Sequence, residues 1–260
     1  MKGRILIIAG SDPSGGAGIQ ADIKAVTALG GYAATAITSL TVQNTMGVTA
    51  VHPVSQRVIV DQINAVVSDI GVDAVKIGMI GNIDAARGIL GALENITAPI
   101  ILDPVLAATS GDALASGDLA DFILREFIPK VFLVTPNIPE AEKLTSLAIK
   151  TEDHQLQAGR RLVGLGAHAA LVKGGHLVDP VIADVLVSGD QEERFAHDRI
   201  ETTSTHGTGC TLASAIAAGV AQGMDLRSAV TRAISYVAEA IKQAPGYGEG
   251  AGPLNHTVSV

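Results

Sequence analysis

The sequence contains no tryptophan, 3% aromatic residues and a single cysteine, Cys210, among its 260 residues. One cysteine excludes an intrachain disulfide, which fits a reducing compartment, and we therefore expect a cytoplasmic protein. Because large aromatic side chains are scarce while glycine occurs 29 times, we expect the core to rely on aliphatic residues and on close contact between helices and a sheet.

Positive charge is also scarce, since 18 basic side chains stand against 26 acidic ones and give a formal net charge of −8. This balance argues against nucleic acid or an anionic membrane surface as a partner, although it is compatible with a local anion site. Long apolar runs are missing too: the run Ile5–Ala9 is too short for a signal peptide or a membrane span. We expect small-molecule partners, with no nucleic acid and no membrane.

The sequence does contain a β–α alternation, which is typical of one large α/β domain over residues 1–260. Apolar runs rich in β-branched residues predict strands buried on both faces, and helical segments separate them. Such crossovers favour a parallel sheet with helices on both faces. The expected strands are 5–9, 33–42, 74–80, 100–105, 131–134 and 169–172, and the expected helices are 19–29, 55–70, 83–93, 119–127, 139–146 and 153–165.

The pattern changes after residue 176. The runs 181–187 and 194–200 flank the turn residues Ser188-Gly189-Asp190, which predicts an antiparallel hairpin at an edge of the sheet near 181–200. Two further helices are expected over 208–222 and 226–242. Asp225 is a plausible N-cap for the second of them.

Polar residues follow the predicted strands at the points where those strands end. Open α/β sheets bind their ligands at the carboxyl ends of the strands, so we expect these residues to converge on one site. In chain order they are the loop Gly10–Gly18, Gln43-Asn44, Met79, Asp103, Thr135-Pro136-Asn137 and Lys173-Gly174-Gly175.

The stretch Ser204–Cys210 is a turn that leads directly into an apolar helix. Gly207 and Gly209 allow a tight turn whose N–H groups point into one concavity, and the helix adds its unpaired N–H groups and a partial positive charge. This predicts an anion site, most simply for a phosphate. A helix N-terminus favours the thiolate of Cys210 and a reactive role, whereas the alternative is an ordinary buried cysteine. His206 either contributes to the site or caps the turn.

Charged and amide side chains at the same sheet edge suggest further roles. Asp103 and Glu140 are candidates for holding Mg²⁺ through water, although the first could simply end a strand and the second could lie on a solvated helix face. Lys173 either reaches a bound phosphate or extends its ammonium to solvent. Asp22 lies one turn into a helix, where the dipole favours an acid. The planar amide of Gln43 suits the donor and acceptor edge of a heterocycle, or belongs to an ordinary turn.

The standard nucleotide-binding motifs are absent from the sequence. No Gly-x-x-x-x-Gly-Lys-Ser/Thr occurs, which excludes a P-loop, and Gly207-x-Gly209 lacks the third glycine of the dinucleotide fingerprint. A Cys/His metal cluster and a Gly-x-Ser-x-Gly elbow are also missing.

Taken together, several motifs identify a family. Gly207-Thr208-Gly209-Cys210 and Asn137-x-x-Glu140 resemble signatures of the ribokinase-like superfamily. Other stretches are similar to the hydroxymethylpyrimidine/phosphomethylpyrimidine kinases of thiamine synthesis, and the resemblance covers essentially the whole chain. These stretches are Gly10–Asp22, Thr38–Thr45, Asp103-Pro104-Val105, Thr135-Pro136-Asn137, Lys173-Gly174-Gly175-His176 and Gly252–His256.

The resemblance implies a ribokinase-like, three-layer α/β/α fold and transfer of the ATP γ-phosphoryl group to 4-amino-5-hydroxymethyl-2-methylpyrimidine. A second transfer to the resulting monophosphate would give the diphosphate. It also implies Mg²⁺ as cofactor and a homodimer. The implied site residues are Gly10, Asp22, Gln43, Met79 and Val105 for the substrate, Thr135, Asn137 and Lys173 for the nucleotide, Asp103 and Glu140 for the metal, and Gly207, Thr208, Gly209 and Cys210 for catalysis.

Three questions stay open at the level of sequence. Many superfamily members carry an aspartate base where this chain has Cys210, so the thiol either removes the hydroxyl proton or lines the anion hole. If it is the base, Cys210→Ala should harm the first phosphorylation more than the second.

The overall function has two alternatives to the pyrimidine kinase. One is a pyridoxal or pyridoxine kinase of the same fold, and the other is a non-catalytic pyrimidine-phosphate sensor. The loops 10–18 and 105–117 are candidate lids.

Overall fold

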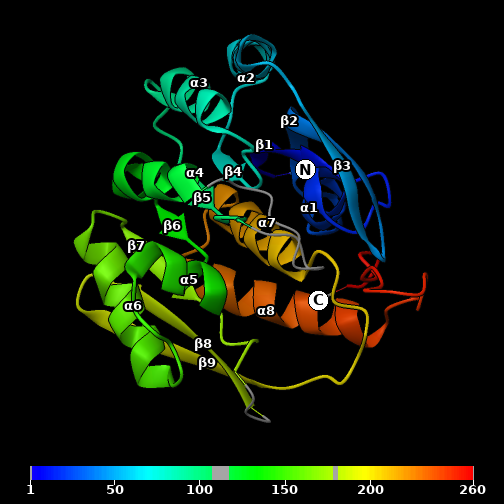
Figure 1. Ribbon diagram of the computed structural model, residues 1–260, viewed down its shortest axis with the longest axis vertical. Helices are drawn as coiled ribbons and strands as arrows, with labels where there is room; N and C mark the ends of the chain where they lie inside the picture. The colour runs from blue at the N-terminus through cyan, green and yellow to red at the C-terminus, as the bar shows by residue number, and fades with distance from the viewer. Residues whose placement is uncertain (1, 107–116, 178–180, 260) are drawn as a thin grey trace.

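The computed structural model describes residues 2–106, 117–177 and 181–259, which are built around a nine-stranded sheet (Figure 1). The strands are β1 (Arg4–Ser11), β2 (Tyr32–Asn44), β3 (Gly47–Pro53), β4 (Ala74–Ile77), β5 (Ile100–Leu102), β6 (Leu133–Val134), β7 (Ala169–Val172), β8 (Val181–Ser188) and β9 (Gln191–Asp198). Their order across the sheet is β3-β2-β1-β4-β5-β6-β7-β8-β9.

The six strands from β2 to β7 in this order run parallel, while β8 and β9 pair antiparallel at one edge. The sheet therefore confirms the expected parallel arrangement with an antiparallel edge hairpin, and it brings six carboxyl ends to the same side. The hairpin register pairs Ser188 with Gln191, so β9 begins three residues earlier than the expected 194.

The sequence does not predict β3, which pairs antiparallel with β2 and makes the other edge antiparallel as well. A short turn through Thr45 and Met46 joins the two strands, and the side chain of Asn44 accepts a hydrogen bond from the Met46 N–H. No residue of β3 is buried. The alternation of buried and exposed side chains that signals a strand is therefore missing from it.

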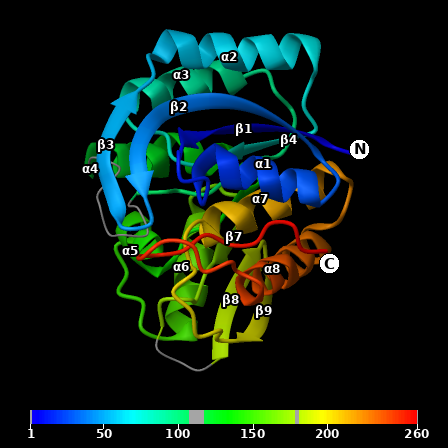
Figure 2. The same cartoon turned by 90° about the vertical axis from the view of Figure 1, so that its right-hand side faces the viewer.

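Helices cover both faces of the sheet, as Figures 1 and 2 show. In β1, Ile5 and Ile7 pack into the core shared with α1, α7 and α8, while Leu6 and Ile8 pack into the core shared with the other helices. This confirms the three-layer α/β/α architecture. The helices are α1 (Gly18–Ala28), α2 (Gln56–Asp69), α3 (Ile83–Leu93), α4 (Gly117–Phe122), α5 (Ile138–Thr145), α6 (Glu152–Gly164), α7 (Thr208–Ala221) and α8 (Leu226–Lys242).

Two expected strands are shorter than the sequence suggests, and one expected helix changes its type along its length. β4 ends at Ile77 and β5 at Leu102, and the Val105 N–H bonds back to the Asp103 carbonyl, so the chain turns there. The helix expected over 119–127 ends as α4 and continues as a π-helical turn over residues 123–127. None of the helices in the described residues is long and apolar enough to cross a bilayer.

The chain after α8 runs back across the carboxyl-end edge of the sheet, drawn in red in Figure 2. The Ala251 N–H donates to the Thr45 carbonyl at 2.9 Å, beside the β2–β3 turn. The Gly252 carbonyl in turn accepts the His206 N–H at 3.0 Å. This C-terminal segment therefore joins the tip of β2 to the turn that precedes α7.

Candidate active site

A cavity of about 800 Å³ opens at the carboxyl ends of the parallel strands. All but two of the site residues expected from the sequence line it, and the two exceptions are Asp22 and Thr135. The lining residues among those expected are Gly10, Gln43, Met79, Asp103, Val105, Asn137, Glu140, Lys173, Gly207, Thr208, Gly209 and Cys210.

The turn before α7 is locked against the first loop of the chain. Gly207 adopts a φ of +80°, which glycine adopts readily, and a Cβ there would lie 1.9 Å from the Gly16 carbonyl oxygen. A second contact holds the start of α7, because the Thr211 hydroxyl lies 2.9 Å from the Nε2 atom of His256. The first N–H groups of α7 have no helical partners and face the cavity as an anion site.

Cys210 lines this anion site, but its chemistry differs from the sequence-based expectation. The pKa of the Cys210 thiol is raised to about 12, chiefly by burial; Lys76 opposes the rise, and Asp22 and Asp103 add to it. The expected bias toward thiolate is therefore wrong for the free protein. Desolvation and neighbouring carboxylates outweigh the helix N-terminus, so the thiol is protonated at neutral pH.

Asp103 and Lys173 form an ion pair that faces the turn. Lys173 Nζ lies 3.0 Å from Asp103 Oδ1, and the Thr135 hydroxyl donates to the same oxygen at 3.3 Å from outside the cavity. A Cβ on Gly209 would lie 3.2 Å from Lys173 Nζ. Although burial alone would lower the pKa of Lys173, Asp103 and Glu140 raise it, so the ammonium stays charged beside the anion site.

Glu140 is placed by the first turn of α5. Its carboxylate accepts the Asn137 N–H at 2.9 Å, and the Asn137 side chain accepts the Glu140 N–H at 2.9 Å, which is a complete capping box. The pKa of Glu140 is raised to about 7, chiefly by burial; Lys173 opposes the rise, and Asp103 adds to it. The sequence suggested a solvated helix face as the alternative, and the buried carboxyl contradicts that alternative.

Asp103 and Glu140 fit a magnesium site of the kind that relies on phosphate and water. Among the described residues no group of three or more His, Cys, Asp or Glu side chains is arranged to hold a metal by itself. Mg²⁺ usually takes one or two carboxylates and completes its shell with water and substrate phosphates. Two neighbouring carboxyls beside an anion site are the donor set that this arrangement needs.

Asp22 does not line the cavity, contrary to the expectation from the family resemblance. Its carboxylate is fully buried and receives Lys76 Nζ at 2.9 Å on each oxygen and the Ser214 hydroxyl at 2.7 Å. The negative charge of Asp22 raises the pKa of Lys76 against the effect of burial. In this structure Asp22 is engaged in an internal ion pair and is out of reach of a ligand.

The end of the cavity between β2 and the turn before α7 is polar. Here Thr41 Oγ1 lies 3.2 Å from Gln43 Oε1, and His206 Nε2 lies 3.3 Å from Gln43 Nε2. The same His206 nitrogen lies 2.8 Å from Asp12 Oδ2, and both of these residues are buried. Sequence reasoning left the role of His206 open and gave Asp12 none, although both stand inside motifs that flank the cavity.

Asp12 also ties down the glycine-rich loop that the sequence suggests as a lid. Its carboxylate accepts hydrogen bonds from the Ser14 N–H, the Ser14 hydroxyl and the Ala17 N–H at 2.8–2.9 Å. Burial would raise the pKa of Asp12, but the hydrogen bonds from His206, Ser14 and Ala17 lower it. The loop is held in place here. Most of the other candidate lid, residues 107–116, lies outside the described residues.

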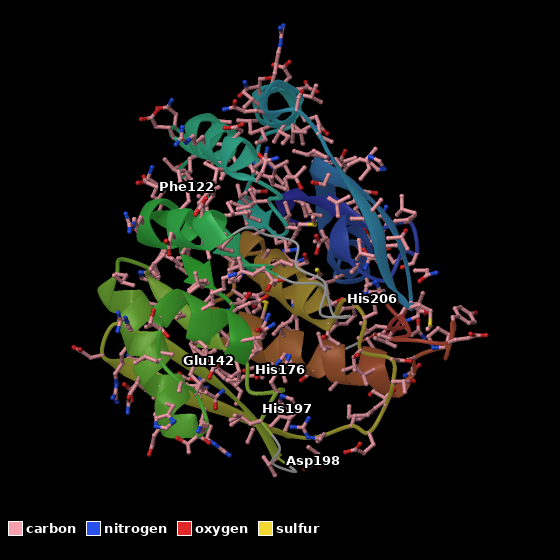
Figure 3. The ribbon with its side chains drawn as sticks, in the orientation of Figure 1. Phe122, Glu142, His176, His197, Asp198 and His206 are labelled. Atoms are coloured by element: carbon pink, nitrogen blue, oxygen red, sulfur yellow. The ribbon has the colours of Figure 1, made fainter. Side chains whose placement is uncertain are left out.

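An apolar helix face lines another part of the cavity. Ile234, Val237 and Ile241 of α8 line it together with His176 and His197, which Figure 3 shows well apart from His206. Sequence reasoning missed the α8 residues, because an apolar helix face predicts only core packing. The cavity thus joins a polar end near Gln43, a central anion site and an apolar helix face.

Comparison with known proteins places the chain in a family. The family model of phosphomethylpyrimidine kinase matches residues 12–255. The chain belongs to this family. The resemblance inferred from the motifs is thereby confirmed, and with it the assignment of the chain to the kinases.

Individual relatives of the chain support its assignment to the phosphomethylpyrimidine kinase family. A hydroxymethylpyrimidine/phosphomethylpyrimidine kinase of Rhizobium meliloti is 45% identical and covers 96% of each chain. The thiamine biosynthesis bifunctional protein ThiED of Geobacter sulfurreducens is also 45% identical over 99% of this chain, which spans 53%, about half, of that longer protein. An ADP complex of Bacillus subtilis pyridoxal kinase matches with a TM-score of 0.92 at 30% identity, covering 99% of this chain and 98% of its own.

Proposed function

We propose that the chain transfers the γ-phosphoryl group of ATP to the hydroxymethyl group of 4-amino-5-hydroxymethyl-2-methylpyrimidine. It then transfers a second phosphoryl group to the monophosphate, giving the diphosphate for thiamine synthesis. One observation supports this proposal above all: the Asp103–Lys173 pair faces the glycine turn at Gly209 between a polar and an apolar end of one cavity. Such a centre suits a phosphoryl group in transit.

The residues of the central site act mainly by positioning and by charge. The N–H groups of the Gly207–Cys210 turn stabilise the negative charge of the transferring group, and Lys173 neutralises charge on the nucleotide phosphates. The raised pKa of Cys210 favours a thiol that lines the anion hole over one that acts as base. For the second transfer the acceptor is already a phosphate oxygen, which has little need of a base.

Mg²⁺ is proposed as the cofactor, held by Asp103 and Glu140 through oxygen ligands. When bound it neutralises and orients the phosphates of ATP. The capping box of Asn137 keeps the Glu140 carboxyl in place for this task. Nucleotide binding by Asn137 and Thr135 is retained as a proposal, the second acting through its bond to Asp103.

The decisive experiment incubates the purified protein with ATP, Mg²⁺ and the pyrimidine alcohol and follows the products by phosphorus NMR. We expect the monophosphate first and the diphosphate afterwards, with two ADP formed per diphosphate. ADP formation that does not exceed the rate without the alcohol would contradict the proposal. If the protein then still bound the pyrimidine monophosphate, the sensor alternative would stand.

Pyridoxal or pyridoxine phosphorylation is the second candidate, favoured by the structural match to a pyridoxal kinase. We propose it as a side activity, because the amide of Gln43 suits an aminopyrimidine edge better. Values of kcat/KM for the pyrimidine alcohol and for pyridoxine, measured side by side, test this. A larger value for pyridoxine would reverse the order of the two functions.

We further propose that residues 1–260 act as one kinase domain, that the protein is cytoplasmic and that it forms a homodimer. Support for the dimer comes from large apolar side chains exposed around the β2–β3 edge, namely Leu40, Val42, Met46 and Val51. Light scattering after size exclusion measures the mass directly. A monomer at micromolar concentration would contradict the dimer, and cell fractionation tests the location.

A further inference from the structure

The polar end of the cavity, where the proposed acceptor would bind, holds a buried pair, Asp12 and His206, that none of the proposed steps uses. We propose that this pair is a positioning device that fixes which end of the Gln43 amide faces which side of the cavity, and thereby sets the acceptor that is accepted. The inference rests on the proposed function, because it takes Gln43 as the residue that reads the heterocycle. It follows from counting hydrogens at three neighbouring side chains.

The first constraint comes from His206. An ionised carboxylate can only accept hydrogen bonds, so the His206 nitrogen that lies 2.8 Å from Asp12 Oδ2 must carry a hydrogen. That nitrogen, Nε2, therefore cannot accept a hydrogen bond from Gln43, whose amide lies 3.3 Å away. An N–H of Gln43 at this place would oppose the His206 N–H donor to donor, so the amide end that faces His206 is its oxygen, which can share the hydrogen that His206 donates to Asp12.

The second constraint comes from Thr41. Its hydroxyl has one hydrogen and lies 3.0 Å from the Ser11 carbonyl oxygen, which can only accept. The Thr41 oxygen is then free only to accept from Gln43, whose amide lies 3.2 Å away. With the Thr41 hydrogen donated to Ser11, the amide end that faces Thr41 is its nitrogen, which agrees with the orientation set by His206.

Rotating the Gln43 amide by half a turn about its Cγ–Cδ bond suits both neighbours, Thr41 and His206. The two ends of an amide are nearly identical in shape, so their assignment follows from the hydrogen-bond network. After the half-turn, Nε2 donates to Thr41, and Oε1 faces the His206 N–H as a second acceptor of the hydrogen that His206 donates to Asp12. One N–H and one lone pair of Gln43 are left over, in a fixed order, for a ligand in the cavity.

This fixed order selects a ligand edge on which a ring nitrogen stands beside an amino group. The spare N–H of Gln43 pairs with the ring nitrogen and the spare lone pair with the amino group. Were the amide reversed, the ring would have to turn over to keep both pairs, which would carry its hydroxymethyl group to the opposite side of the Gln43 amide. A pyridine ring without an adjacent amino group satisfies only half of the pattern. The Asp12–His206 pair thus couples recognition of the edge to the direction of the reacting group.

The surroundings hold His206 rigidly enough for this role. A Cβ on Gly16 would lie 2.3 Å from His206 Cδ2, so the ring is wedged against the first loop. Its backbone N–H is held by the Gly252 carbonyl at 3.0 Å. A positioning group needs such support from its neighbours, since a loose one would let the amide turn.

Two variants of His206 test the proposal with a matched pair of substrates. His206→Leu removes the ring N–H, whereas His206→Gln supplies an N–H near the position of Nε2. The substrates are the pyrimidine alcohol and its analogue that lacks the 4-amino group. We expect His206→Leu to lower kcat/KM for the first by about 10- to 100-fold, as for one mispaired buried polar group, and to change the second little. His206→Gln should restore most of the discrimination.

A merely structural role would lower kcat/KM for both substrates alike, and that outcome overturns the proposal. A double-mutant cycle adds a second test. In a Gln43→Leu background, His206→Leu should not change the ratio of the two kcat/KM values any further, because His206 acts through Gln43. A further fall in that ratio would show that His206 contacts the acceptor independently, which also overturns it.

A readout without catalysis separates this inference from the proposed function. Nitrogen NMR of the imidazole of the wild-type protein should show a hydrogen on His206 Nε2. A bare Nε2 with the hydrogen on Nδ1 overturns the positioning role even if the protein phosphorylates the pyrimidine. If instead the protein phosphorylates no aminopyrimidine while Nε2 carries its hydrogen, the proposed function fails and the amide geometry stands. The NMR result also decides the matter should His206→Leu fail to fold.

Discussion

Lys76 on β4 and Asp22 on α1 form a fully buried ion pair, with Nζ 2.9 Å from each carboxylate oxygen. The Ser214 hydroxyl of α7 donates to the same carboxylate at 2.7 Å. The pair therefore connects the sheet to two helices directly beneath the cavity. It also explains why an acid in the family's opening motif is out of reach of a ligand here.

Removing one partner of this ion pair should destabilise the folded protein. We expect Lys76→Met to lower the free energy of unfolding by about 3–5 kcal/mol, because it leaves an uncompensated buried carboxylate. The double variant Lys76→Met/Asp22→Leu should recover part of that loss. Urea unfolding measures both. A single variant that costs less than ~1 kcal/mol, or a double variant that costs the sum of the two singles, would contradict the account.

Cys210 should behave as a poorly reactive thiol. With its pKa raised to about 12, it should resist iodoacetamide at pH 7 far better than free cysteine does, because the thiolate is the nucleophile. We also expect Cys210→Ala to lower both phosphorylation steps by similar factors, as for a residue that lines the anion hole. Rapid alkylation, or a loss confined to the first step, would instead support a catalytic base.

Glu140 should make stability depend on pH in the absence of divalent metal. Its folded-state pKa of about 7 lies above the ordinary 4.5, so the folded protein keeps a proton that the unfolded chain loses between these values. The contribution to stability is complete below pH 4.5 and is lost as the pH rises through about 7. Urea unfolding at pH 5 and pH 8 measures this fall.

Glu140→Gln is the matched variant for that experiment, because its amide oxygen can still accept the Asn137 N–H of the capping box. The variant should lack the part of the fall between pH 5 and pH 8 that Glu140 causes. A pH dependence identical to that of the wild type would show that Glu140 does not titrate in this range.

Gly207 and Gly223 offer a comparison between two glycines with nearly the same backbone. Their φ angles are +80° and +83°, but a Cβ on Gly207 would strike the Gly16 carbonyl, whereas one on Gly223 meets nothing within 4 Å. We expect Gly223→Ala to cost about 1 kcal/mol from its φ alone, with activity unchanged. Gly207→Ala should cost more and remove most of the activity. Equal effects in unfolding and activity assays would refute the proposed interlock.

The sequence allowed the sheet edge that carries the site to be predicted, because parallel strands bring their carboxyl ends together. Asp103 and Lys173 could be found in this way, since each directly follows an apolar strand. The roles of Asp22 and Lys76 could not, because a lysine within an apolar strand shows nothing of a partner 54 positions away. The charge state of Cys210 was misjudged for the same reason: local position favoured the thiolate, whereas burial and distant carboxylates decide it.

The C-terminal segment has a consequence for how the protein is made. His206 contacts Asp12 near the start of the chain through its ring and Gly252 near its end through its backbone. A nascent chain that grows from its N-terminus can complete β1 and β2 early, yet it has no acceptor pocket until residues beyond 252 have left the ribosome. The pocket around Gln43 therefore forms only after the segment that contains Gly252 has been synthesised, later than β1 and β2.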